Sequence, residues 1–211
     1  MEHDLSIRWL GLASYEDVLA EQERLVSELA THPGGQETLL LLEHTPVFTI
    51  GRSPNQTSLR DHGALPHPVH VTNRGGQATY HGPGQLVGYP ILDLRRRGQD
   101  LHKHLRALET LVVETCAAFG VQAGTREGLT GVWVEDRKIA SIGVGVRRWI
   151  SMHGFALNVT VDCLVAFSHI TPCGIDGVQM TCLEAEGGDG ISVRTVADWV
   201  TANAQFELLA G

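Results

Sequence analysis

With 211 residues, 43% of them hydrophobic and 19% charged, the chain is long enough to bury a real core and has the composition of an ordinary folded protein. Its formal net charge of −8 argues against a nucleic-acid-binding surface, for which a basic face would be expected. Two short basic clusters, at residues 95–97 and 147–148, are either local docking patches for an acidic partner or ordinary solvated surface.

No targeting or membrane segment is expected from the sequence. Residues 1–4 are acidic and no apolar segment follows them, so a secretory signal is not predicted. The apolar run Leu39–Leu42 is too short to span a bilayer. We therefore expect a cytoplasmic protein that binds neither nucleic acid nor membranes.

The first quarter of the chain predicts a helix followed by buried strands. Ser14 can cap an amphipathic helix that ends at residues 32–35, where His-Pro-Gly-Gly breaks it. A strand over residues 38–43 follows, and its four leucines in a row leave no face for solvent. A second strand is predicted over 47–50, and a long loop over 51–68, which is rich in Pro, Ser, Asn and His.

The next segment predicts two strands, over 69–72 and 86–92, on either side of a glycine-rich loop, and then a second amphipathic helix. Asp100 can cap this helix and Gly120 can end it. Cys116 lies on its apolar face, where we expect an inert thiol.

The last part of the chain predicts a meander of three strands and two helical segments. The strands cover 132–135, 138–146 and 151–159, a helical stretch covers 162–167, and an amphipathic helix runs from Ser192 towards Leu208. The predicted strands occur both as hairpins and as single runs, and helices flank them. This pattern predicts an α/β (α+β) fold in one domain, with a mixed, largely antiparallel sheet flanked by helices.

Residues 74–85, Arg-Gly-Gly-Gln-Ala-Thr-Tyr-His-Gly-Pro-Gly-Gln, form the most unusual stretch of the sequence. Four glycines alternate with polar side chains, a composition that neither a packed helix nor a buried strand would favour. Glycine lets the backbone approach a ligand closely and adopt φ > 0 without steric cost. We interpret the stretch as a binding loop, and the alternative is an ordinary glycine-rich turn.

Cys173 lies in a Pro-Cys-Gly turn, where the thiol would project from a loop. On the residues alone it is either a nucleophile or a silent buried thiol. A thiol of ordinary pKa, about 8.5, needs a base or a cation beside it to act as a thiolate at neutral pH. Lys138, which opens an apolar strand, is the candidate, and the alternative is a surface lysine at the Asp136–Arg137 turn.

Four histidines, His62, His67, His70 and His81, invite a metal-site interpretation. No two of them have the His-x-x-x-His spacing, and no acidic residue is placed as in zinc proteases. We therefore expect no metal. The four cysteines have neither Cys-x-x-Cys spacing nor the density of a disulfide scaffold, so we expect free thiols.

Three motifs in this order, residues 74–85, Asp136–Gly143 and Pro172–Ile175, resemble the lipoyl(octanoyl) transferases, and the likeness extends from about Leu39 to Leu183. One departure is Cys182, where the family commonly has a serine, and Cys163 is also atypical. Both leave open whether Cys173 is the sole reactive thiol.

The resemblance implies a single catalytic domain over residues 1–211, related to the catalytic module of biotin and lipoate ligases and working without a cofactor. It would move an octanoyl group from acyl carrier protein to a lysine of lipoyl domains, in 2-oxoacid dehydrogenase subunits and the glycine cleavage H protein. Cys173 would carry the acyl group as a thioester, and Lys138 would act as a base or as a cation. We expect a monomer.

The resemblance also implies which residues bind the substrate. They are Arg74, Gly75, Gly76, Gln77, Ala78, Thr79, Tyr80, His81, Ser141, Ile142, Gly143, Gly154, Phe155 and Ala156. Tyr80 and Phe155 would wall an acyl slot, and His81 would be a second polar group over the thioester rather than the main base. Backbone N–H groups near Gly143 or Gly174 are candidate oxyanion donors.

Three rival functions remain open at this stage. An ATP-dependent lipoate ligase would form an acyl-adenylate and would need no nucleophilic cysteine. A non-catalytic module would only bind lipoyl domains or acyl carrier protein. A cysteine hydrolase would release free octanoate without an amine acceptor.

Overall fold

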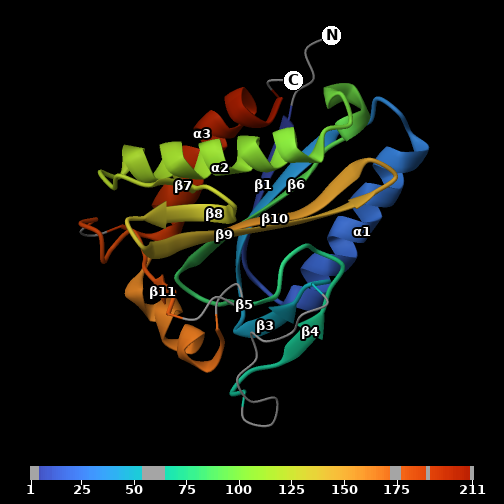
Figure 1. Cartoon of the computed structure of the whole chain (residues 1–211). Coiled ribbons are helices and arrows are strands. Elements are labelled where there is room, and N and C mark those ends of the chain that lie inside the picture. The colour runs from blue at the N-terminus through green and yellow to red at the C-terminus, as the bar shows by residue number, and fades with distance from the viewer. Residues whose placement is uncertain (1–4, 54–64, 172–176, 189–190, 210–211) are drawn as a thin grey trace.

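The computed structural model describes residues 5–53, 65–171, 177–188 and 191–209 (Figure 1). Within them an eight-stranded sheet has the order β1-β2-β6-β10-β9-β8-β7, with β11 paired to β9. The pairs β1–β2 and β11–β9 are parallel and the others are antiparallel. This confirms the expected mixed, largely antiparallel sheet. The strands are β1 (Leu5–Ala13), β2 (Glu37–His44), β6 (Gln85–Ile91), β7 (Gly124–Arg126), β8 (Leu129–Val134), β9 (Arg137–Arg147), β10 (Ile150–Asn158) and β11 (Gln179–Met180).

A second sheet of three strands lies beside the main one and has the order β4-β3-β5 (Figure 1). Its strands are β3 (Val47–Ile50), β4 (Val69–Val71) and β5 (Ala78–His81). The glycine-rich stretch was expected to contain no buried strand, and β5 corrects that expectation. All four of its residues are buried and pair antiparallel with β3. Pairing and burial within the fold thus override the low strand preference of the surrounding glycines.

The described residues also form three α-helices and two 3₁₀ segments: α1 (Tyr15–Thr31), α2 (Leu101–Ala118), α3 (Val193–Leu209), η1 (Leu94–Arg97) and η2 (Val161–His169). The predicted caps are present. Ser14 Oγ accepts the N–H of Asp17 at 3.2 Å, and Asp100 Oδ1 accepts the N–H of Lys103 at 3.0 Å. In the described part of the chain, none of the helices combines the length and hydropathy needed to cross a bilayer.

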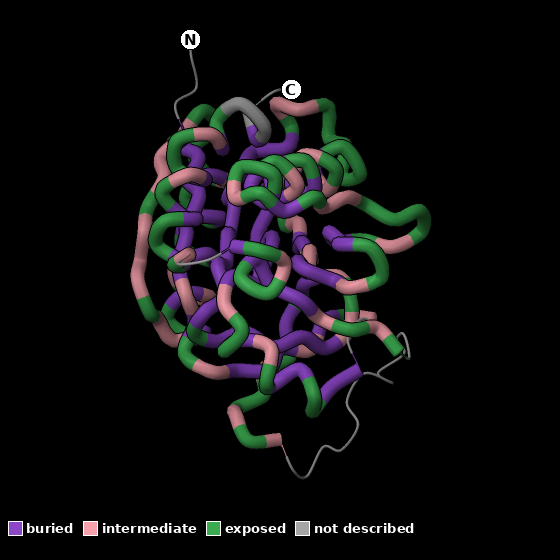
Figure 2. The backbone as a smooth tube through the Cα atoms, turned by 90° about the vertical axis from the view of Figure 1, so that its left-hand side faces the viewer, coloured by how far each residue is buried: buried purple, intermediate pink, exposed green. Residues whose placement is uncertain are grey.

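The four leucines of β2 serve two hydrophobic clusters on opposite faces of the sheet. Leu39 and Leu41 pack in the cluster that contains the apolar sides of α2 and α3, whereas Leu40 and Leu42 pack in the cluster under α1. In Figure 1, α2 and α3 lie side by side over one face and α1 lies apart from them. Figure 2 shows the buried residues concentrated in the strands between these layers. The alternation of strand side chains explains why this run has no polar member.

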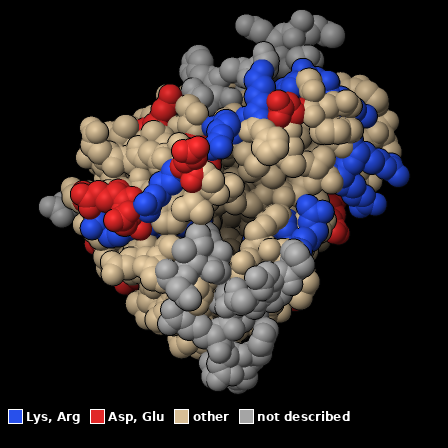
Figure 3. Space-filling model, viewed as in Figure 1, with Lys and Arg blue, Asp and Glu red and all other residues tan. Residues whose placement is uncertain are grey.

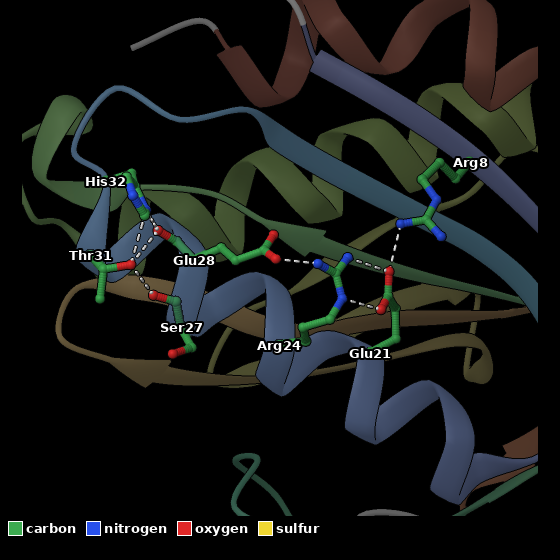
Figure 4. Close-up of polar contacts among 7 residues, drawn as sticks. All are labelled: Arg8, Glu21, Arg24, Ser27, Glu28, Thr31 and His32. Carbon is green, nitrogen blue, oxygen red and sulfur yellow. Dashed lines mark hydrogen bonds and ion pairs between the residues drawn. The ribbon is translucent and has the colours of Figure 1, made fainter.

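An ion-pair network joins β1 to the exposed face of α1 (Figure 4). Glu21 accepts hydrogen bonds from Arg24 at 2.7 Å and from Arg8 at 2.6 Å, and Arg24 also contacts Glu28. The hydrogen bond from Arg24 is the main reason that the pKa of Glu21 falls to about 2. Exposed pairs of this kind stabilise a protein by at most about 1 kcal/mol each, so the network contributes little beside the core.

The two basic clusters lie next to each other, because the N–H of Leu94 donates to the carbonyl of Trp149 at 2.8 Å. The arginines of residues 95–97 already contact carboxylates of the chain. Arg95 pairs with Asp93 at 2.7 Å and Arg97 with the buried Glu37 at 2.6 Å. On the face drawn in Figure 3, acidic and basic side chains are interspersed. This pairing favours a structural role for residues 95–97 over a docking patch.

His104, on the buried side of α2, should make the protein less stable in acid. Burial is the main reason that its pKa falls to about 4, and the charge of Arg97 adds to the shift. In the unfolded chain the imidazole titrates near pH 6.5. As the pH falls from about 6.5 to about 4, the unfolded chain takes up a proton that the folded chain does not, so the free energy of unfolding decreases.

We predict that His104→Leu reduces this acid sensitivity. Its Nε2 has no hydrogen-bond partner among the described residues, so leucine sacrifices no bond at that atom. Between about pH 7.5 and about pH 5, the variant should lose about 2 kcal/mol less unfolding free energy than the wild type. Urea unfolding at the two pH values measures the difference. Equal losses in both proteins would contradict the prediction.

Candidate active site

A cavity of about 270 Å³ lies against β9 and β10, and its wall also includes β5 and Tyr15, the first residue of α1. Segments that are far apart in the sequence meet here, and they include two of the three motifs. The predicted binding residues in the wall are Arg74, Gly76, Gln77, Ala78, Thr79, His81, Ser141, Ile142, Gly143, Gly154, Phe155 and Ala156. Lys138 also lies in the wall.

Gly75 and Tyr80 are not in the wall. The N–H of Gly75 donates to the carbonyl of Val144 at 2.9 Å, which fastens the loop to β9. Tyr80 is buried beside Phe48 and Phe167, with ring centroids 5.3 and 5.8 Å away. Tyr80 therefore does not wall the slot as expected, because its ring packs against the rings of Phe48 and Phe167 instead.

Glycines let the loop and the strands approach each other closely at the cavity. A Cβ on Gly143 would lie 3.0 Å from the carbonyl oxygen of Gly75, and one on Gly154 would lie 2.3 Å from that of Gly88. Gly143 and Gly154 pair directly across β9 and β10. A glycine inside a strand usually marks a bulge or a close backbone approach, and these two mark a close approach.

Arg74 holds the loop from inside. Its guanidinium is buried and donates to the carbonyl of Thr49 at 2.8 Å and to that of Gly75 at 2.9 Å. These bonds join β3 to the loop and fix the entry to β5. The side chain thus shapes the cavity wall as well as facing it.

The histidines of the site are neutral. Burial, more than any other effect, lowers the pKa of His81 well below its usual range and that of His153 to about 4. His81 Nδ1 lies 2.8 Å from Gln85 Oε1, and His153 Nε2 lies 2.6 Å from Asn73 Oδ1. Neither ring supplies a cation at neutral pH. Among the described residues no group of His, Cys, Asp and Glu is arranged to hold a metal, and His62 lies outside them.

Lys138 is buried, with 2% of its surface exposed, so the alternative of a surface lysine is wrong. Its Nζ donates to the carbonyl of Thr130 at 3.0 Å and lies 5.2 Å from the ring centroid of Trp133. The register of β8 on β9 shifts at this point, where Val132 pairs with Ala140 but Trp133 pairs with Lys138. Such an irregularity can re-aim a side chain, here towards the cavity.

Cys173 and Gly174 lie outside the described residues. The other three cysteines, Cys116, Cys163 and Cys182, are buried and free. Burial is the main cause that raises the pKa of each thiol, to about 12 for Cys116. They are therefore protonated at neutral pH, as was expected for Cys116.

Several wall residues were not predicted from the sequence, among them Tyr15, Tyr89, Thr130, Trp133 and His153. Tyr15 belongs to the apolar stripe of α1, and Trp133 looks like an ordinary strand residue, so neither carries a local signal. Gln77 Oε1 and Trp133 Nε1 are buried without a hydrogen-bond partner in the described part of the chain.

Residues 14–205 match the family of the lipoyl protein ligase A/B catalytic domain. An octanoyltransferase of Citrifermentans bemidjiense is 52% identical over 196 residues, which cover 93% of each chain. The fold is similar to that of P. falciparum LipL1 in complex with lipoate, with a TM-score of 0.70 and 14% identity over 96% of this chain and 63% of that one. A biotin protein ligase from Aquifex aeolicus has a TM-score of 0.54 and 16% identity, over 99% of this chain and 70% of that one. The expected likeness of the fold to lipoate and biotin ligases is confirmed.

Proposed function

The chain belongs to the family of the lipoyl protein ligase A/B catalytic domain, and from this premise we propose that it is an octanoyltransferase that serves lipoate biosynthesis. The observation that carries the proposal is the 52% identity to an octanoyltransferase over nearly the whole of both chains. A lysine buried in the wall of a cavity agrees with acyl transfer, since burial holds a reactive amine away from solvent.

The proposed donor is octanoyl-acyl carrier protein and the proposed acceptors are lysines of lipoyl domains. The thiolate of Cys173 attacks the thioester carbonyl, the bond to the carrier sulfur breaks, and the carrier leaves as a thiol. The lysine amine of a lipoyl domain then attacks the acyl-enzyme, giving an amide and the free Cys173 thiol. Lys138 either takes and returns the proton or stabilises the thiolate as a cation.

The cavity suits an acyl chain. Ile142, Phe155 and Ala156 contribute apolar side chains to its wall, and Gly143 and Gly154 let the neighbouring backbone come close enough to complete that wall. Each buried methylene contributes about 0.8 kcal/mol, so the six methylenes of an octanoyl chain contribute about 5 kcal/mol. Neutral His81 would lie near the chain as a polar group rather than as a strong base.

Intact-protein mass spectrometry of the wild-type protein with octanoyl-acyl carrier protein, without ATP, tests the function. We expect one octanoyl adduct that moves to an added lipoyl domain. A requirement for ATP with no adduct would favour a ligase. Release of octanoate without an acceptor would favour a hydrolase, and the absence of both adduct and product would favour a binding module.

Gly131→Ala should disturb Lys138 directly. A Cβ on Gly131 would lie 2.6 Å from Lys138 Cε, and φ at this position is +125°. We expect octanoyl transfer to fall by about tenfold or more, because small displacements of a reacting group are costly. Gly120→Ala is the matched control, since Gly120 also has positive φ (+80°) but no atom within 4 Å of a Cβ. Equal rates for the two variants, measured as octanoylated lipoyl domain formed, would contradict the prediction.

A further inference from the structure

Glu109 is a carboxylate on the buried side of α2. Only 2% of its surface is exposed, and the neighbouring residues Leu108, Leu111 and Val112 belong to the hydrophobic core. A buried carboxylate is costly unless its oxygens are hydrogen-bonded or paired. Glu109 therefore needs partners, and those partners indicate what it does.

Both oxygens of Glu109 have partners. Oε2 contacts the guanidinium of Arg106, whose side chain is 66% exposed. Oε1 accepts the backbone N–H of Gly131 at 3.1 Å. The second contact links α2 to β8, so the carboxylate reaches from the helix layer into the sheet.

The peptide group between Thr130 and Gly131 connects Glu109 to Lys138. Its N–H is the one that Glu109 accepts, and its carbonyl oxygen accepts the hydrogen bond from Lys138 Nζ at 3.0 Å. A carboxylate, one peptide unit and an ammonium thus form two consecutive hydrogen bonds. Hydrogen bonds in such a chain polarise one another, and a charged acceptor strengthens the bond that it receives.

The backbone around the Thr130–Gly131 peptide is irregular, so the orientation of this peptide depends on the hydrogen bonds that it makes. Gly131 has φ of +125°, and the register of β8 on β9 shifts just beyond it. A Cβ on Gly131 would also lie 2.7 Å from the carbonyl oxygen of Ala140, so the backbones here are already in close contact. Rotation of the Thr130–Gly131 peptide would move the carbonyl away from Nζ, and the bond to Glu109 opposes that rotation.

We propose that Glu109 is a positioning residue for Lys138 and acts through the Thr130–Gly131 peptide. It touches no substrate. Its carboxylate orients and polarises the carbonyl that holds the ammonium in the cavity wall. This inference rests on the proposed function, in which Lys138 serves the thioester chemistry.

The test is Glu109→Gln, which keeps the volume and one acceptor oxygen but removes the charge. In single-turnover octanoyl transfer we expect a rate about five- to thirtyfold lower, with KM for the octanoyl carrier changed less than about twofold. In the Lys138→Met background the same substitution should change the residual rate by less than about twofold, since no ammonium remains to be held. Glu114→Gln, an exposed position of the same helix, is the charge-matched control and should behave as wild type.

A wild-type rate for Glu109→Gln would overturn the inference. An equal loss of rate in both backgrounds would also overturn it, because that result would indicate a merely structural role. A wild-type rate for Lys138→Met would remove the proposed role of Lys138 and this inference with it. A low rate of octanoyl transfer for Lys138→Met together with a wild-type rate for Glu109→Gln would overturn only the inference about Glu109 and would leave the proposed function standing.

If Glu109→Gln does not fold, the two hydrogen bonds that join Glu109 to Lys138 through the Thr130–Gly131 peptide can still be tested in proteins that keep Glu109. The backbone amide resonance of Gly131 should shift between wild type and Lys138→Met, because the peptide that carries this N–H loses its ammonium partner. An unchanged Gly131 resonance, measured beside that of the remote Gly120, would overturn the proposal.

Discussion

Cys173→Ser is expected to give no octanoyl adduct and to lower octanoyl transfer by about 10³-fold or more. The serine hydroxyl has nearly the size of the thiol, but it is far less acidic, so almost none of it is ionised to attack the thioester at neutral pH. The result is read by intact mass after incubation with octanoyl-acyl carrier protein and by the amount of octanoylated lipoyl domain.

Cys182→Ser is the matched control. Cys182 is buried and its thiol has a raised pKa, chiefly because of burial, so the control should keep the wild-type adduct. An adduct that persists in Cys173→Ser, or one that disappears only in Cys182→Ser, would show that the nucleophile has been assigned to the wrong residue.

Lys138→Met is expected to slow transfer by about 10²- to 10⁴-fold, the usual contribution of a positioned acid or base. Methionine fills most of the volume of the lysine stem, so the packing beside Trp133 should survive while the ammonium is lost. Steady-state kinetics should show the loss in kcat, with KM for the carrier nearly unchanged. Lys103→Met, an exposed substitution on α2, provides the control for loss of charge.

Lys138→Arg separates the two roles that the sequence left open. Arginine keeps a positive charge but does not give up its proton in proteins. A rate that recovers to within about tenfold of wild type would favour a cation beside the thiolate, whereas a rate as low as that of Lys138→Met would favour proton transfer. A wild-type rate for Lys138→Met itself would contradict any part for this residue in the chemistry.

The helices and most strands could be predicted because their signals are local. Ser14, Asp100 and Ser192 are helix caps that the sequence identifies by residue type, and each accepts a backbone N–H in the structure. Apolar periodicity then sets the length of each helix. The strand β5 could not be predicted, since its burial depends on pairing with β3 and not on its own glycine-rich surroundings.

The residues of the candidate site also fall into those that the sequence could predict and those that only the fold reveals. Resemblance of motifs was sufficient to select most of the cavity wall, because those residues come in short consecutive runs. It failed for Tyr80, where the direction of the side chain depends on a strand that the sequence did not reveal. Glu109 carried a usable signal, a single acid within the apolar stripe of α2, but its partner Gly131 lies 22 residues away and appears only in the fold.

The leucine run of β2 does not by itself fix the register of this strand against its neighbours. If β2 slipped by one residue against its neighbours, leucines would still occupy both faces, so the apolar middle of the strand does not select one alignment. The polar ends do. Glu37 accepts the N–H of Asp93 at 2.7 Å and pairs with Arg97, and His44 Nε2 lies 2.8 Å from the hydroxyl of Tyr89. Any slip would leave these buried groups unpaired, so two polar anchors set the alignment of this leucine-rich strand.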